Sequence, residues 1–197
     1  MLLKQKADQI VNILTTLPQV KGCSIYGSVV NGTSDELSDI DVEIDVSGID
    51  NGKFMLELID LLKDKIDIIY SDYAPSLIPE YYIVSAAIDR DNPFLIVDFR
   101  CCGKPHCSTV TKEYVKSLND KYSHILKLWT ANLKHYARKR DCYDDIISMA
   151  NKLGIDTSGK NEKDLLKETL LWLEDNAKDN FVEFIATCKT YFERLTR

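Results

Sequence analysis

Residues 39–46 have the sequence Asp39-Ile40-Asp41-Val42-Glu43-Ile44-Asp45-Val46, in which acidic and apolar side chains alternate without exception. Successive side chains of a β-strand point to opposite faces of the sheet, so this alternation predicts a strand with one apolar face and one acidic face. The apolar face is suited to a hydrophobic core. The acidic face is the first candidate for a functional site.

The acidic face has the spacing of a cation-binding strand. Asp39 and Asp41 are two residues apart, so their Cα atoms lie about 6.5 Å apart on one face and their carboxylates can converge on one ion. Two Mg²⁺ ions held by shared carboxylates support in-line transfer of a phosphoryl or nucleotidyl group. The alternative is a solvated acidic edge strand, which repulsion between neighbouring carboxylates disfavours unless a cation neutralises them.

A glycine turn precedes the acidic strand. The apolar segment 23–26 predicts a short strand that stops at Gly27, and Ser28 opens the segment that follows. Backbone N–H groups and a hydroxyl at such a turn can hold the terminal phosphates of a nucleotide. A Gly-Ser pair by itself predicts only a turn, so its significance comes from the carboxylates that follow it.

Together, Tyr26-Gly27-Ser28 and Asp39-Ile40-Asp41-Val42 resemble the signature of the DNA polymerase beta-like nucleotidyltransferase superfamily. Segments 27–33 and 38–41 are most similar to its bacterial small-molecule branch, which includes the aminoglycoside and lincosamide nucleotidyltransferases. The resemblance is close around these motifs and looser over residues 1–105.

The resemblance implies a small mixed sheet flanked by helices, two Mg²⁺ ions, and an NTP as the donor of a nucleoside monophosphate. By the same resemblance, Gly27 and Ser28 contact the donor phosphates, and Asp39 and Asp41 bind metal and are catalytic. This chain departs from the pattern in one place. Many members of the branch carry a basic residue after the Gly-Ser pair, where this chain has Val30 and Asn31.

The superfamily also places a third carboxylate on a later strand, where it completes a metal site and can accept a proton from the acceptor hydroxyl. Two residues compete for this role. Asp98, in the apolar segment 95–99, corresponds to the antibiotic-modifying members, and Asp67, in segment 66–68, corresponds to the minimal members. We favour Asp98 as the third catalytic and metal-binding residue and keep Asp67 as the alternative.

The patterns along the chain predict an α+β region followed by an all-helical C-terminal domain. The resemblance implies that the α+β region has the nucleotidyltransferase-type fold, a small mixed sheet flanked by helices. We expect a catalytic domain at residues 1–108 and a helical domain at 109–197, where strand patterns no longer occur. The expected helices of the first domain are 3–16 and 54–62, and its expected strands are 23–26, 39–46, 66–70, 81–88 and 94–99.

Composition limits the classes of protein that the chain can belong to. A net charge of −6 and a pI near 5.1 argue against a protein that coats nucleic acid, because that affinity comes from Lys and Arg contacts to phosphates. The sequence predicts neither a signal peptide nor a membrane-spanning segment, so we expect a cytoplasmic protein with reduced thiols. Cys101, Cys102, His106 and Cys107 lie close together in the sequence, but their spacing is not that of a zinc finger.

The leading hypothesis is a Mg²⁺-dependent nucleotidyltransferase that moves NMP, most simply AMP from ATP, to a hydroxyl of a small molecule and releases pyrophosphate. We expect the acceptor to bind in a cleft between the two domains, and a homodimer is compatible with the resemblance. Two alternatives remain at this stage. One is an enzyme that modifies tRNA or protein, and the other is a catalytically inert nucleotide-binding module.

Overall fold

The computed structural model describes residues 2–106 and 108–197, so Cys107 of the thiol-rich segment lies outside the described residues. The chain forms two compact units, one comprising Met1–Asp89 and Leu95–Asn119 and the other Arg90–Phe94 and Asp120–Arg197. A compact unit is not by itself an independently folding domain, so the boundary between residues 108 and 109 stays a prediction. Each unit is described separately below.

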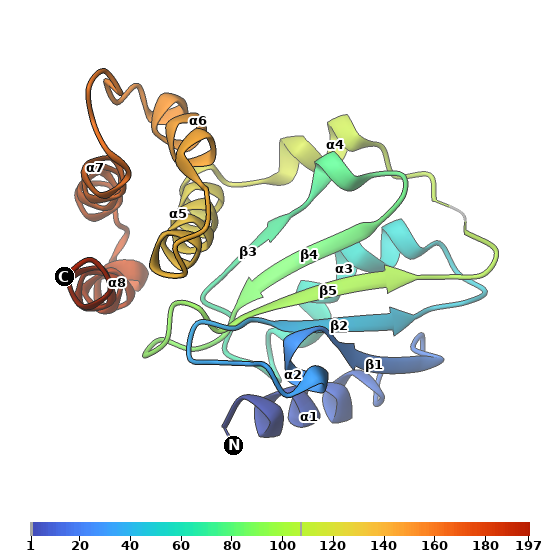
Figure 1. Cartoon of the computed structure of the whole chain (residues 1–197). Helices are drawn as coiled ribbons and strands as arrows, with labels where there is room; N and C mark the ends of the chain where they lie inside the picture. The colour runs from blue at the N-terminus through green and yellow to red at the C-terminus, as the bar shows by residue number, and fades with distance from the viewer. Residues whose placement is uncertain (1, 107) are drawn as a thin grey trace. The chain divides into compact units, whose positions relative to one another are not determined.

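The first unit is built on a five-stranded mixed sheet in the order β1-β2-β5-β4-β3 (Figure 1). Strands β2 and β5 run parallel, and every other neighbouring pair is antiparallel. This confirms the predicted small mixed sheet, including the antiparallel hairpin of β4 and β5. The strands are β1 (Gly22–Tyr26), β2 (Ile40–Asp45), β3 (Tyr70–Tyr73), β4 (Tyr82–Ala87) and β5 (Ile96–Cys102).

Helices α1 (Leu2–Leu14) and α3 (Asn51–Leu62) pack against the sheet and bury the apolar sides of its strands. Ile40, Val42 and Ile44 of β2 are fully buried, as the alternation predicts. They join a core with residues of α3, including Phe54 and Leu58. Three short helices complete the unit: α2 (Ser28–Asn31), η1 (Pro75–Leu77) and α4 (Lys112–Leu118).

Two predicted elements differ from the structure. Residues 66–69 are not a strand, because the ladder to β4 begins only where Tyr70 pairs with Ala87, and the Ile66 N–H is still bonded to the Leu62 carbonyl at the end of α3. Helix α3 begins at Asn51 rather than at residue 54, because Asp50 caps it. Apolar periodicity marks the buried face of a helix and not its polar first turn.

The second unit is helical, which confirms the predicted helical C-terminal region. Helix α7 contacts each of the other three long helices. Two buried aromatic donors fix it: the Trp129 indole N–H donates to the Leu166 carbonyl and the Tyr122 hydroxyl donates to the Leu173 carbonyl, each at 2.9 Å. The elements are α5 (Lys121–Ala137), α6 (Tyr143–Leu153), α7 (Glu162–Asp175), η2 (Asp179–Phe181) and α8 (Val182–Leu195). None of the helices described is both long and apolar enough to cross a bilayer.

Asp50 connects the start of α3 to a distant loop. Its carboxylate accepts hydrogen bonds from the backbone N–H of Lys53 at 2.9 Å and from the backbone N–H of Thr109 at 2.9 Å. Partial burial raises the pKa of Asp50, but these hydrogen bonds outweigh burial and the pKa lies below its ordinary value. The ionised form is therefore the one that stabilises the fold.

We expect Asp50→Ala to lower the free energy of unfolding by about 1–2 kcal/mol at pH 7, because the helix cap and the loop contact are both lost. Since the pKa of Asp50 is lower in the folded state, its stabilisation is complete above about pH 4 and declines as pH falls through the folded value. Urea denaturation between pH 3 and 7 measures both effects. Glu57→Ala, an exposed change in the same helix, is the control, and an equal loss in both variants would contradict the capping role.

Candidate active site

The parallel pairing of β2 with β5 brings two of the predicted carboxylates side by side. Asp41 of β2 lies opposite Asp98 of β5 in the register. Their strand neighbours Val42, Val97 and Phe99 are fully buried, whereas both aspartates are half-buried. The two carboxylates therefore lie on the face of the sheet opposite the core.

Asp39 lies immediately before β2, at the end of a tightly bonded turn. In this turn the Asp35 carboxylate accepts hydrogen bonds from the Leu37 N–H at 3.1 Å and from the Ser38 hydroxyl at 2.8 Å. The Ser38 hydroxyl oxygen in turn accepts a hydrogen bond from the Asp35 N–H at 3.0 Å. Ser38 is buried, so the chain enters β2 from a fixed position. The turn thus sets where Asp39 lies relative to Asp41.

Gly27 lies directly against Asp41. Its backbone has φ 73° and ψ −148°, a conformation that is essentially restricted to glycine. A Cβ at this position would overlap the Asp41 carboxylate, with Asp41 Cγ only 3.2 Å away. The next residue, Ser28, begins α2 and is half-buried. The structure therefore brings Gly27 and Asp41 together, and Ser28 follows them directly in the chain.

Tyr26, at the end of β1, pairs in register with Asp41. Burial, followed by the negative charges of Asp41 and Asp98, raises the pKa of Tyr26 to about 12. The phenol is therefore neutral at physiological pH and keeps its O–H as a hydrogen-bond donor. Because both aspartates act on its pKa, Tyr26 places its hydroxyl within the electrostatic reach of both carboxylates.

Ser85 and Asp72 extend the row of Asp41 and Asp98 across the sheet. Ser85 of β4 pairs with Asp98 and donates its hydroxyl hydrogen to Asp98 Oδ1. Asp72 of β3 pairs with Ser85, and both residues are 1% exposed. Neither residue was predicted from the sequence. The one available signal for Ser85 is a hydroxyl within the otherwise apolar segment 82–88.

The adjacent row of the same face contains a cation, Arg100, which was not predicted from the sequence. Arg100 of β5 pairs in register with Glu43 of β2, and its guanidinium lies 3.4 Å from the Glu43 carboxylate. On its other side the guanidinium stacks over the Tyr81 ring, 4.3 Å from the centroid. Arg100 follows Asp98 by two residues, so alternation in an extended strand puts both on one face, whereas its pairing with Glu43 depends on the register with β2.

Asp67, the alternative third carboxylate, lies in the loop before β3, at the edge of the sheet. Strands β4 and β5 separate β3 from β2. The residue of β3 that falls in the same row as Asp41 and Asp98 is Asp72. The strand order therefore places Asp98, and not Asp67, beside Asp41.

The thiol-rich segment has its own local structure. Cys101 is buried in the core and its burial raises its pKa, while burial raises the pKa of Cys102 to about 11. Both side chains are therefore neutral thiols at physiological pH. His106 Nδ1 lies 3.3 Å from Asn51 Nδ2, at the first turn of α3.

The carboxylates near the starts of β2 and β5 fit Mg²⁺ in donor chemistry and in backbone placement. Mg²⁺ takes hard oxygen ligands, and the register sets Asp41 next to Asp98 with Asp39 two residues before Asp41. Because Gly27 has no side chain, the Asp41 carboxylate can lie directly against the backbone of the glycine turn. Among the described residues, no group of three His, Cys, Asp or Glu side chains is gathered closely enough to hold an ion as they stand.

Comparison with known proteins agrees with this geometry. Residues 8–88 match the family model described as polymerase beta, nucleotidyltransferase, a range that includes Gly27, Asp39 and Asp41. The chain therefore contains a nucleotidyltransferase-type domain. No curated protein matches the chain in sequence.

Solved structures also match the chain. One of them, titled "structure of GLD-2/RNP-8 complex", aligns at 11% sequence identity with a TM-score of 0.40. The alignment covers 99% of this chain and 66% of that chain, which is less than two thirds of its length. At this TM-score the likeness is reported without further argument.

Two glycine variants test the contact between the glycine turn and Asp41. Gly27→Ala should lower the free energy of unfolding by at least about 1 kcal/mol more than Gly32→Ala. Gly32 also has a positive φ, of 69°, but it lies in the left-handed helical region and a Cβ there meets nothing within 4 Å, so Gly32→Ala reports the cost of that conformation without a steric contact. Urea denaturation of both variants measures the difference, and equal losses would contradict the close approach of Gly27 to Asp41.

Proposed function

We propose that this chain, which contains a nucleotidyltransferase-type domain, is a Mg²⁺-dependent enzyme that transfers AMP from ATP to a hydroxyl of a small molecule and releases pyrophosphate. The observation that carries the proposal is the pairing of Asp41 with Asp98 on neighbouring parallel strands, with Asp39 at the entrance to β2. The match of residues 8–88 to the polymerase beta family supports the reaction class. The small-molecule acceptor follows from the sequence resemblance described above.

Asp39, Asp41 and Asp98 are the residues that would hold Mg²⁺. When bound, the ions would neutralise the charge of the donor phosphates and of the leaving pyrophosphate. Residues of the protein would position the donor phosphates. Gly27 lets the glycine turn lie directly against Asp41, and the Ser28 hydroxyl would donate a hydrogen bond to the donor phosphates.

We also assign Asp98 the role of general base for the acceptor hydroxyl. Ser85 donates to Asp98 Oδ1, which orients the carboxylate and leaves Asp98 Oδ2 to accept the proton of the acceptor hydroxyl. A base must lie within hydrogen-bond reach of the proton that it removes, and the row shared by Asp41 and Asp98 allows this for an acceptor that approaches from the Arg100 side.

Glu43, Arg100 and Tyr81 form the surface that we assign to the acceptor. The guanidinium is held between a carboxylate and an aromatic ring, so its position is defined, yet its side chain is still 34% exposed. Such a group can donate hydrogen bonds to acceptor oxygens while the Tyr81 ring packs against an apolar part of the acceptor. This surface lies one row along the strands from Asp98.

Substitution of the carboxylates tests the reaction. Asp39→Asn, Asp41→Asn and Asp98→Asn should each lower Mg²⁺-dependent pyrophosphate release by at least about 100-fold, because each removes a charge that positions the metal or the acceptor. The assay uses labelled NTPs with a panel of aminoglycosides, lincosamides, tRNA and the protein itself. It therefore also identifies the donor base and the class of acceptor.

The controls separate the two candidates for the third carboxylate. Asp67→Asn and the exposed Asp64→Asn should keep full activity. Full activity in Asp98→Asn together with loss in Asp67→Asn would overturn our assignment. Pyrophosphate release only with tRNA or protein would replace the small-molecule acceptor, and no release combined with no Mg²⁺-dependent NTP binding would refute the enzyme.

Arg100→Gln tests the acceptor surface separately. We expect KM for the acceptor to rise by about 10-fold or more, while KM for the NTP changes less than about 2-fold, because Arg100 contacts the acceptor and not the donor. Steady-state kinetics with each substrate varied in turn measures the two values. A matching rise in KM for the NTP would assign Arg100 to the donor phosphates instead.

A further inference from the structure

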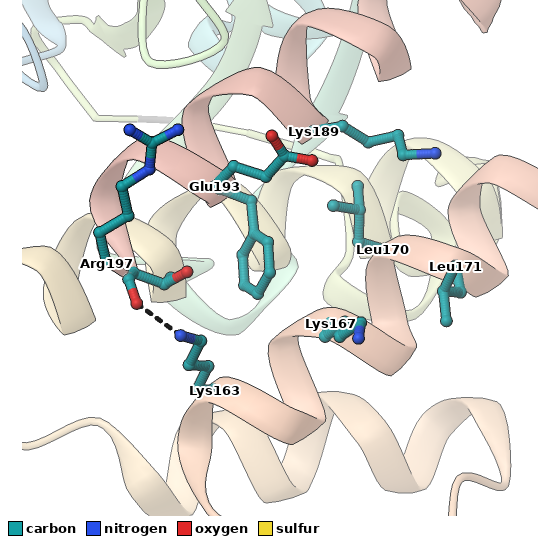
Figure 2. Close-up of a pocket in the computed structure, with 9 residues that line it drawn as sticks. Lys163, Lys167, Leu170, Leu171, Lys189, Glu193 and Arg197 are labelled. Carbon is teal, nitrogen blue, oxygen red and sulfur yellow. Dashed lines mark hydrogen bonds between the residues drawn. The ribbon is translucent and has the colours of Figure 1, made fainter.

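Helices α7 and α8 of the helical unit form a pocket of about 410 Å³ that the proposed reaction does not use (Figure 2). This volume lies within the range of small-molecule sites. Leu170 and Phe192 are buried in it, at 4% and 7% exposure, and Leu171 is exposed at 45%. The pocket therefore offers apolar surface to a ligand.

Four cations line the same pocket. Lys163 and Lys167 lie one turn apart on α7, Lys189 lies on α8, and Arg197 follows that helix. Glu193 is the one acid among the lining residues that the structure describes. In a chain with a net charge of −6, this is a local excess of positive charge over an apolar floor. Such a combination favours an anion with an apolar body.

The cations are not equally available to a ligand. Lys189 pairs with Glu174 at 2.6 Å, and Lys163 donates to the Thr196 carbonyl at 2.6 Å. Lys167 is exposed, and it lines the pocket. Like charges at i and i+4 disfavour a helix by a few tenths of a kcal/mol, so an anion bound beside Lys163 and Lys167 would also reduce their repulsion. Lys167 is therefore the cation that we expect to meet a ligand.

We propose that this pocket binds a small amphipathic anion, an alkyl or aryl chain with one phosphate or carboxylate group. Lys167, with Arg197 nearby in the lining, holds the anionic group, and Leu170, Leu171 and Phe192 hold the apolar chain. The site is independent of the carboxylates of the sheet. Its failure would leave the proposed nucleotidyl transfer unaffected, and the reverse also holds.

Isothermal titration calorimetry of the full chain tests the proposal with four probes: hexyl phosphate, butyl phosphate, hexan-1-ol and inorganic phosphate. Hexyl phosphate should bind saturably to one site per chain, and each methylene added between butyl and hexyl should tighten Kd by about 4-fold. Hexan-1-ol and inorganic phosphate should each bind at least about 10-fold more weakly than hexyl phosphate. Heptanoate, tested in the same way, distinguishes a carboxylate from a phosphate preference.

Variants locate the site. Lys167→Glu should weaken hexyl phosphate binding by at least about 10-fold, and Leu171→Ser should reduce the gain per methylene. Lys152→Glu makes the same charge reversal at an exposed position of α6 and should leave Kd unchanged. Circular dichroism confirms that each variant is folded.

Three results would overturn the proposal. The first is no saturable binding of hexyl phosphate or heptanoate, and the second is equal binding by the wild type and Lys167→Glu. The third is a wild-type dimer in sedimentation experiments without amphiphile that the Lys167→Glu substitution dissociates. In that case a second copy of the chain would cover the pocket.

Discussion

The parallel pairing of β2 with β5 is the constraint on which the first unit depends. In this register the apolar residues of both strands enter the core on one face, and Asp41 meets Asp98 on the other. A shift of either strand by one residue would bury its carboxylates and expose its apolar residues. The burial of Ile40, Val42, Val97 and Phe99 stabilises this register and therefore also sets the positions of the carboxylates. The hydrophobic core and the candidate site therefore lie on opposite faces of the sheet, and the same strand register positions both.

The turns before and after β2 position the chain for this register. Before β2, the Asp35 and Ser38 side chains close the turn that leads to Asp39. After β2, Asp50 begins α3 and at the same time holds the backbone of Thr109. In each turn, side-chain oxygens accept hydrogen bonds from backbone N–H groups. These N–H groups have no partner within a strand or helix, so the side chains satisfy them. Short polar contacts thus fix the chain both before and after β2.

The sequence predicts those parts of the fold that follow from local periodicity. The alternation in residues 39–46 specifies β2 and its two faces, and the segments around the turn 89–93 predict the hairpin of β4 and β5. Pairing between distant strands has no such local signal, so the register of Asp41 with Asp98 could be expected only through the family resemblance. Ser85 and Arg100 went unrecognised because their importance depends on which strand lies beside them. The error at residues 66–69 arose because an apolar segment can pack in a loop as well as in a strand.

Gly27 has a consequence for how the protein can change over time. Its backbone conformation excludes other residues, and the space beside its Cα is filled by the Asp41 carboxylate. A larger residue at position 27 could be accommodated sterically only by a smaller one at position 41, and that second change would remove a carboxylate. The two positions therefore lack a neutral path of compensating substitutions. Descendants of this chain that lose Gly27 are therefore expected to lose the close contact between the glycine turn and a carboxylate at position 41.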